Sequence, residues 1–400
     1  MTTYYNAEFA AEYIVKRDPD GNWCEWNEST TDYDSLITGL NGVVYCMAEG
    51  PDGKIYVGGL FTDAGGDTDA DYLARWNPIS ETWEKVIAGL NNRVSSLDFD
   101  ANGDLYIAGQ FTNLKTAYGD YVAKITDLDG TPTVNVLNTA INIPNGPVQT
   151  IKVGTDGCVY IGGGFTSTGP ASTGRISKHD GSEWVAVGTG FSDGAVATLA
   201  FAPNGDLYIG GTFTNADGTN GDYLCYWDGS SFNRVGTVEL NGQLISIDFD
   251  AQARLIVGGV FTNAGGVSGA DYIARWNGAS WESLGTGTNG YVWRIFSIDN
   301  KIYVAGEFTA AGGITLTDRV AVWSNGAWQP LDIDLPGTAT VYSILPASDG
   351  SLYIGGSFST VGEDPYEDAV CGLSYEVEVA EEIEESVDED DIDPIDNTGV

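Results

Sequence analysis

The chain has 400 residues and a formal net charge of −40, from 17 lysines and arginines against 57 aspartates and glutamates. This balance argues against nucleic-acid partners and against anionic membranes, because both require clustered cations on the protein. One histidine and five cysteines without CxxC spacing do not supply a zinc site of ordinary ligand spacing.

Residues 1–12 form a polar lead-in that has neither the basic region nor the apolar core of a secretory signal. Two short segments follow, Tyr13–Arg17 and Trp23–Trp26, and both read as strands. No stretch approaches 18 consecutive apolar residues, so we expect no membrane-spanning helix and no membrane insertion.

From residue 43 onward the chain repeats a unit of four short strands, in the ranges 43–87, 94–137, 148–188, 196–236, 244–285 and 292–332. A last half-unit runs from residue 341 to 358. Each unit holds a hydrophobic strand, a polar turn, a strand ending in Gly-Gly or Ala-Gly, and then a phenylalanine. This phenylalanine recurs every 47–54 residues, as Phe61, Phe111, Phe165, Phe213, Phe261, Phe308 and Phe358. A repeat of this length, built from strands and tight turns, predicts a β-propeller.

The strand count predicts an all-β fold, a single seven-bladed β-propeller with four-stranded blades, spanning residues 13–375. The two N-terminal strands match the outer half of a unit and would complete the last half-unit. The ring would then be closed by N- and C-terminal strands, which removes free sheet edges. Val370–Val379 also reads as a third strand, so the sequence leaves open whether the N-terminal segment supplies two strands or one.

The residues that recur in register predict structural roles. The paired glycines at the end of the second strand are not a phosphate loop, because no helix follows them. They predict close packing between blades. The repeated phenylalanines and tryptophans predict an aromatic core between blades in preference to a row of sugar-stacking side chains.

Acidic residues also recur. An aspartate before the third strand is expected to stabilise the turn, while a ring of such carboxylates holding calcium is the alternative; its positions are Asp71, Asp120, Asp222, Asp271, Asp318 and Asp368. Asp100, Asn102 and Asp104 form a weak calcium-loop pattern that lacks the distal bidentate glutamate. We expect no other cofactor. His179 replaces a repeated structural residue, so it does not indicate a catalytic triad.

The C-terminal tail, residues 376–400, contains twelve acids and no base. Such a run predicts a solvated, disordered segment, with a docking peptide as the alternative. The cysteines predict scattered buried thiols; a Cys24–Cys46 disulfide at the ring closure is the other interpretation.

The long loops after the second strands vary most between repeats, and loops on rigid scaffolds often carry function. Loops 112–120 and 166–174 depart furthest from the pattern. We therefore predict that they engage a partner, and the candidate residues are Asn113, Lys115, Tyr118, Thr166, Ser167, Ser172 and Arg175.

The run Tyr-Ile-Gly-Gly-x-Phe-Thr, followed by Ile-Ala-Arg-Trp-Asn-Gly, resembles kelch-type repeats and, more closely, the Rax2-like propeller repeats of bacterial and viral surface proteins. The resemblance implies an adhesion, display or assembly module. It does not extend to the copper site of kelch-containing galactose oxidases, because a single histidine cannot supply that two-histidine site.

These observations favour a non-enzymatic module of a virion, such as a bacteriophage head or tail, or of another exposed surface. Its partner would be a protein or a host glycan. An intracellular interaction scaffold and a secreted carbohydrate-active enzyme are the alternatives. The lack of a secretory signal favours the virion, since phage proteins leave the cell by lysis. The oligomeric state stays open.

Overall fold

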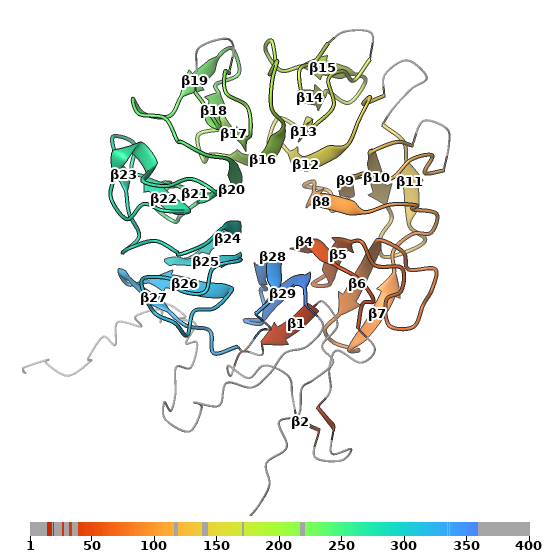
Figure 1. Cartoon of the computed structure of the whole chain (residues 1–400). Helices are drawn as coiled ribbons and strands as arrows, with labels where there is room; N and C mark the ends of the chain where they lie inside the picture. Colours follow the sequence, from red (N-terminus) through yellow and green to blue (C-terminus); the bar gives the residue numbers. More distant parts are fainter. Residues whose placement is uncertain are drawn as a thin grey trace, which may run out of the picture.

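The computed structural model describes residues 14–17, 19, 26–27, 32–33, 39–115, 119–137, 143–169, 172–216, 221–333, 335 and 337–358. Seven antiparallel sheets surround a central axis, and the first strand of each repeat faces that axis (Figure 1). The prediction of a seven-bladed β-propeller is confirmed. The lead-in, the acidic tail and Val370–Val379 lie outside the described residues.

Six blades have four strands in chain order. The first three are β4 (Val44–Glu49), β5 (Ile55–Gly59), β6 (Leu73–Asn77) and β7 (Thr82–Lys85); β8 (Val94–Phe99), β9 (Leu105–Gly109), β10 (Val122–Thr126) and β11 (Thr133–Asn135); and β12 (Val148–Val153), β13 (Val159–Gly163), β14 (Ile176–His179) and β15 (Trp184–Ala186). The next three are β16 (Val196–Phe201), β17 (Leu207–Gly211), β18 (Leu224–Trp227) and β19 (Phe232–Arg234); β20 (Leu244–Phe249), β21 (Leu255–Gly259), β22 (Ile273–Trp276) and β23 (Trp281–Glu282); and β24 (Val292–Ile298), β25 (Lys301–Gly306), β26 (Val320–Ser324) and β27 (Ala327–Gln329).

The seventh blade joins the two ends of the chain. It contains β28 (Thr340–Pro346), β29 (Leu352–Ser357) and the N-terminal β1 (Ile14–Arg17). Strand β1 pairs antiparallel with β29, with Ile14 opposite Gly355 and Arg17 opposite Leu352. Figure 1 shows the two strands side by side. The predicted closure of the ring by strands from both termini is confirmed.

Of the predicted fourth strand of this blade, Trp23–Trp26, the structure describes Trp26, which does not pair with this blade. Trp26 belongs to β2 (Trp26–Asn27), which pairs with β3 (Asp32–Tyr33) in a separate two-stranded sheet. The described part of the seventh blade therefore has three strands. The match to the outer half of a repeat unit marked this segment as a strand, but it could not specify the pairing partner.

The second strand of each blade is enclosed on both faces. All five residues of β5, β9, β13 and β21 are buried. A strand in this position must be apolar on both sides, which explains its uninterrupted hydrophobic sequence. The 3-10 turn η1 (Ala264–Gly266) is the helical element within the described ranges, and those ranges contain no helix long and apolar enough to cross a bilayer.

The first glycine of each pair allows neighbouring blades to approach. A Cβ atom at Gly162 would lie 2.3 Å from Cγ1 of Val196 in the next blade, and one at Gly355 would lie 2.5 Å from Cγ1 of Val44. Gly58, Gly210 and Gly258 show the same conflict. The prediction of close packing between blades is confirmed.

The repeated aromatic side chains form the core between blades, as predicted. Six of the seven phenylalanines are at most 1% exposed, and Phe358 is 4% exposed. The tryptophans pair within blades; the ring centroids of Trp76 and Trp83 are 5.4 Å apart. Cys46 and Cys225 are buried free thiols, which supports the scattered-thiol interpretation over a Cys24–Cys46 disulfide.

Candidate functional site

A repeated pair of hydrogen bonds between an asparagine and a threonine holds the start of the long loops. Asn145, which precedes the first strand of its blade, accepts a hydrogen bond from the Thr166 backbone N–H at 2.8 Å and donates to the Thr166 hydroxyl at 2.9 Å. The same pairing joins Asn41 to Thr62, Asn91 to Thr112, Asn241 to Thr262 and Asn289 to Thr309. Thr166 therefore has a structural role that it shares with other blades.

The described residues of loop 112–120 form hydrogen bonds with each other and with β11. The Asn113 N–H donates to Asp120 Oδ1 at 2.6 Å, and Lys115 Nζ donates to the carbonyl of Val134 on β11. Asn113 and Lys115 are exposed and have positive φ angles of 58° and 63°. The Lys115 side chain is thus held against β11 on the surface, whereas Asn113 is held through its backbone. Tyr118 lies outside the described residues.

The second candidate loop is also internally bonded. Ser172 Oγ donates to the carbonyl of Thr166 at 3.3 Å, and Ser167 and Ser172 form an isolated β-bridge. Arg175 Nη1 lies 3.5 Å from the carbonyl of Gly164. The role of both loops in binding stays a prediction.

Two of the aspartates before the third strand, Asp120 and Asp271, have the local role that was expected, and Asp368 lies outside the described residues. Asp120 Oδ1 accepts from Asn113 N–H at 2.6 Å, and Asp271 Oδ1 accepts from Asn263 N–H at 2.7 Å. Each carboxylate closes the loop that leads into the strand.

The calcium candidate is a hairpin turn that already contains a cation. Asp100 Oδ1 accepts backbone N–H groups from Asn102 at 2.9 Å and from Asp104 at 3.0 Å. Lys124 Nζ lies 3.1 Å from Asp100 Oδ2 and 2.8 Å from Asp104 Oδ2. The ammonium group occupies the position between the carboxylates, which favours a structural turn.

His179 is likewise part of the scaffold. It packs edge-on against Trp184 with ring centroids 5.1 Å apart, and its Nδ1 accepts from Gly181 N–H at 3.2 Å. Burial lowers the pKa of its imidazole, although the charge of Asp180 opposes this shift. A neutral, buried imidazole that bonds its own turn fits a structural position.

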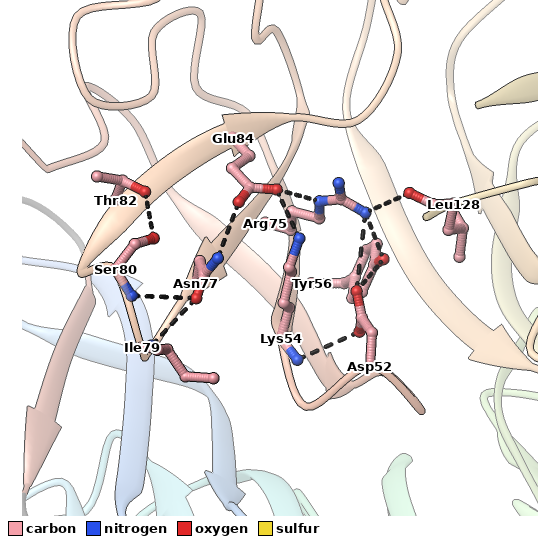
Figure 2. A network of polar contacts seen from close by, with 10 residues as sticks. All are labelled: Asp52, Lys54, Tyr56, Arg75, Asn77, Ile79, Ser80, Thr82, Glu84 and Leu128. Atoms are coloured by element: carbon pink, nitrogen blue, oxygen red, sulfur yellow. Dashed lines mark hydrogen bonds and ion pairs between the residues drawn. The ribbon is translucent and has the colours of Figure 1, made fainter. Parts of the chain in front are cut away.

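A polar network connects β6 and β7 of the first blade with its β4–β5 turn (Figure 2). Arg75 Nε donates to Glu84 Oε2 at 2.7 Å, Lys54 Nζ lies 2.9 Å from the same oxygen, and Arg75 Nη1 donates to the Leu128 carbonyl of the next blade at 2.8 Å. The fifth blade repeats part of it with Arg275 and Glu282. Because the network recurs, we assign it to stability.

Most of the large exposed apolar side chains lie at one end of the blades. In an antiparallel blade, the connections after the second and fourth strands emerge at the same end. Five of the six large, exposed hydrophobic residues in the described ranges belong to these connections, namely Leu60, Val238, Tyr291, Ile314 and Leu316. The sixth, Ile79, is 94% exposed in the β6–β7 turn at the other end. We call the first group the long-loop face.

A cavity of about 650 Å³ lies at the centre of the ring and is lined by the first strand of all seven blades. Each of these strands has a β-bulge at the same place, opposite the end of the second strand and next to the long-loop face. A bulge redirects a side chain out of the regular alternation. The bulged residues are Tyr45, Ser95, Gln149, Ala197, Ile245, Trp293 and Tyr342, and all seven line the cavity.

Aromatic rings occupy one arc of this bulge ring. The centroids of Trp293 and Tyr342 are 5.4 Å apart, and those of Tyr342 and Tyr45 are 5.3 Å apart. The guanidinium of Arg93 lies 5.0 Å from the centroid of Tyr45, within the range of a cation–π contact. The opposite arc, from Ser95 to Ile245, lacks aromatic residues.

The cavity is also richer in cations than the chain as a whole. Arg93, Lys152 and Arg294 line it, against Asp98 and Asp248. Lys152 pairs with Asp98 at 3.1 Å. Burial raises the pKa of Asp248, whereas backbone N–H groups and the charges of Arg294 and Lys152 lower it. The two arginines have no ion pair among the described residues.

Our sequence reasoning missed these cavity residues. The bulge position differs in almost every repeat, while the residues on either side of it are conserved in type between repeats: Val or Leu before it, and a small or polar residue after it in most blades. This variable position inside an otherwise regular strand was the sequence feature that could have indicated the cavity residues. The bulge itself could not be inferred, since one extra residue changes the face of every residue beyond it.

The architecture defines the protein as a seven-bladed β-propeller with a lined central cavity. Its sequence matches the family described as the Rax2 C-terminal beta propeller domain over residues 24–195 and 190–268, which together exceed half of the chain. The chain therefore belongs to this family. The Rax2-like resemblance is confirmed, whereas the kelch-type resemblance stays a prediction. A search of curated protein sequences found no significant match.

Solved structures support the same fold. The chain superposes on streptogramin B lyase with a TM-score of 0.53 at 13% identity, covering 89% of this chain and 98% of the lyase. The WD40 repeats of RRP9 give a TM-score of 0.53 at 13% identity, with 88% and 99% covered. The extracellular domain of a one component system from B. thetaiotaomicron gives 0.51 at 11% identity, with 80% of this chain but only 38% of that chain covered. At such identities these similarities concern the fold alone.

Proposed function

We propose that this protein is a non-enzymatic binding module, with kelch-like repeats of the Gly-Gly-x-Phe-Thr type, on a virion or another exposed surface. It engages a protein partner or a glycan through the long-loop face. The observation that supports this is that five of the six large exposed hydrophobic residues in the described ranges lie on that face, next to the ring of variable bulge residues. Exposed apolar residues grouped on one face are typical of interaction sites.

The binding face is tested with matched surface variants. Leu60 is 45% exposed and Leu316 is 46% exposed, so replacing either with serine removes apolar surface without opening the core. We expect L60S and L316S to reduce adsorption of the labelled protein to virions or cells of its source by about tenfold, the factor expected for about 1.4 kcal/mol. I79S, on the opposite end, is the control. Equal effects of all three variants would contradict the assignment of the face.

The two candidate loops are tested by exchange. Replacing residues 112–120 or 166–174 with the regular loop 262–271 should weaken adsorption while the propeller remains folded by circular dichroism. Unchanged adsorption after both exchanges would remove these loops, and with them Asn113, Lys115, Ser167 and Ser172, from the proposed contact.

The location and the class of protein need separate measurements. Mass spectrometry of purified virions, or of the surface fraction of the source, should detect this chain. Recovery only from a cytosolic complex would favour the intracellular scaffold. A panel of glycosidase, lyase and esterase substrates should show no turnover; turnover abolished by one Asp-to-Asn change would favour the secreted enzyme.

A further inference from the structure

The central cavity contains polar groups that the fold does not use. Nε of Arg93, Nε of Arg294 and Nε1 of Trp293 are buried and have no hydrogen-bond partner within the described part of the chain, and the same holds for Oγ of Ser95. Unpartnered buried polar atoms are costly, so those that belong to residues lining a cavity are candidates for contact with a ligand.

Arg294 is the exception at its repeat position. The residue after the bulge is small or polar in the other blades: Cys46, Ser96, Thr150, Thr198, Ser246 and Ser343. Two of these residues have a clear structural task, because Ser96 Oγ accepts from Ile151 N–H at 3.1 Å and Ser246 Oγ accepts from Ile295 N–H at 3.0 Å in the next blade. A guanidinium cannot accept a hydrogen bond. Packing between blades therefore does not explain an arginine here.

The positive charge of Arg294 affects the pKa values of titratable groups on other blades. Burial raises the pKa of Asp248 on the neighbouring blade, and the positive charge of Arg294 lowers this pKa. Burial raises the pKa of the Cys46 thiol to about 12, and the charge of Arg294 partly offsets this effect from two blades away. Arg294 lines the cavity from β24 of the sixth blade, and its guanidinium has no ion pair among the residues described.

The side chains around these arginines favour a particular ligand chemistry. A guanidinium binds a carboxylate through two parallel hydrogen bonds. The arc of Trp293, Tyr342 and Tyr45 offers flat apolar faces, whereas Ser95 and Gln149 on the other side offer hydroxyl and amide groups. A ligand that uses all three needs an anionic group, a ring with an apolar face and several hydroxyl groups.

We propose that the central cavity binds an acidic sugar of the uronate type, with its carboxylate on Arg93 and Arg294 and its ring against Trp293 and Tyr342. The volume of about 650 Å³ lies within the range of small-molecule sites. Inorganic phosphate would leave the aromatic arc unused, and an aromatic carboxylate would leave the hydroxyl and amide groups unused. A polyacidic partner would be repelled by the net charge of −40.

This assignment deepens the proposed function, since it gives the long-loop face a ligand class at its centre. The test is isothermal titration of the full chain with galacturonate and glucuronate, compared with galactose, phosphate and benzoate at equal ionic strength. We expect a hexuronate to bind at least tenfold more tightly than the neutral sugar, phosphate and benzoate. Equal binding of galactose, or tighter binding of phosphate or benzoate, would overturn the proposal, as would no hexuronate binding.

Two variants take their residues from other blades and so should fold. R294S introduces the serine of blades two, five and seven, and W293I introduces the isoleucine of blade five. R294S should weaken hexuronate binding about 10- to 100-fold, as expected for the loss of a charged hydrogen bond. W293I should weaken hexuronate and galactose alike, because it removes the stacking surface and keeps both arginines. K85S, at the blade rim, should bind like the wild type.

The two proposals can fail separately. If R294S has the melting temperature of the wild type and still binds hexuronate equally well, the sugar does not bind at Arg294. If L60S loses adsorption while the wild-type chain binds no hexuronate, the long-loop face is supported and the sugar site is contradicted.

Discussion

Gly162 and Gly164 lie two positions apart and have opposite surroundings. A Cβ at Gly162 would lie 2.3 Å from Val196 Cγ1 and 3.0 Å from Thr150 Cγ2, whereas a Cβ at Gly164 would have no atom within 4 Å. We expect G162A to lower the free energy of unfolding by about 1–3 kcal/mol through overpacking, and G164A to change it by less than about 0.5 kcal/mol. Denaturant unfolding measures both. An equal effect of the two substitutions would contradict the role of Gly162 in blade packing.

The single residue Glu84 is expected to make the stability of the fold depend on pH. Burial disfavours its charged form, but hydrogen bonds from Lys54, Asn77 and Arg75 outweigh this and lower its pKa to about 2 from an ordinary value of 4.5. A carboxyl with a lowered pKa in the folded state stabilises the fold above its unfolded pKa, and this contribution is lost as the pH falls from about 4.5 to 2.

The corresponding variant is E84Q. We expect it to be less stable than the wild type at pH 7, by at most about 1 kcal/mol because solvent screens the partly exposed network. Its stability should then fall less steeply between pH 5 and pH 2, as followed by thermal melting. E183Q, at an exposed turn residue, is the control. Parallel pH profiles of E84Q and the wild type would show that the network of Figure 2 contributes little.

At the scale of the element, strand β1 determines whether the ring closes. Ile14 is 2% exposed and packs into the core with Val44 and Tyr353, and the strand pairs with the edge of β29. Removal of residues 1–18 should expose this edge and the buried surface beneath it, so we expect a large drop in melting temperature and aggregation. Removal of residues 1–12 leaves β1 in place and should have little effect. Light scattering during thermal melting distinguishes the two. A stable, monomeric 1–18 deletion would show that closure does not depend on β1.

At the scale of the whole molecule, the net charge of −40 opposes compactness. Burial raises the pKa of Asp71, and the nearby charges of Asp69, Asp63 and Asp67 raise it further, which is a local sign of this repulsion. Raising NaCl from about 10 mM to about 500 mM should therefore increase the melting temperature, because salt screens exposed charges.

Calcium chloride at matched ionic strength separates screening from binding. If only screening acts, the two salts should shift the melting temperature by similar amounts. A much larger shift with calcium that D100N abolishes would establish a cation site at Asp100, Asn102 and Asp104. No shift with either salt would contradict the repulsion.

Several features of this protein were predictable from the sequence because they are periodic or local. The spacing of Phe61 and its equivalents determined the number of blades, since each repeat can bury its aromatic face only against a neighbour. The offset of the N-terminal strand within the repeat determined that the ends of the chain meet in one blade. Even the second blade, which lacks the usual tryptophans, kept its fourth strand β11, because pairing with β10 does not require them.

Other features were decided only by the tertiary structure. Trp26 pairs with Tyr33 and not with the seventh blade, because composition specifies a strand but not its partner. The seven bulges bring Tyr45, Trp293 and Tyr342 from distant repeats to one arc of the cavity, and Arg93 and Arg294 beside them. Tyr45 and Tyr342, about 300 positions apart, become neighbours only when the ring closes, and no local pattern in the sequence encodes that proximity.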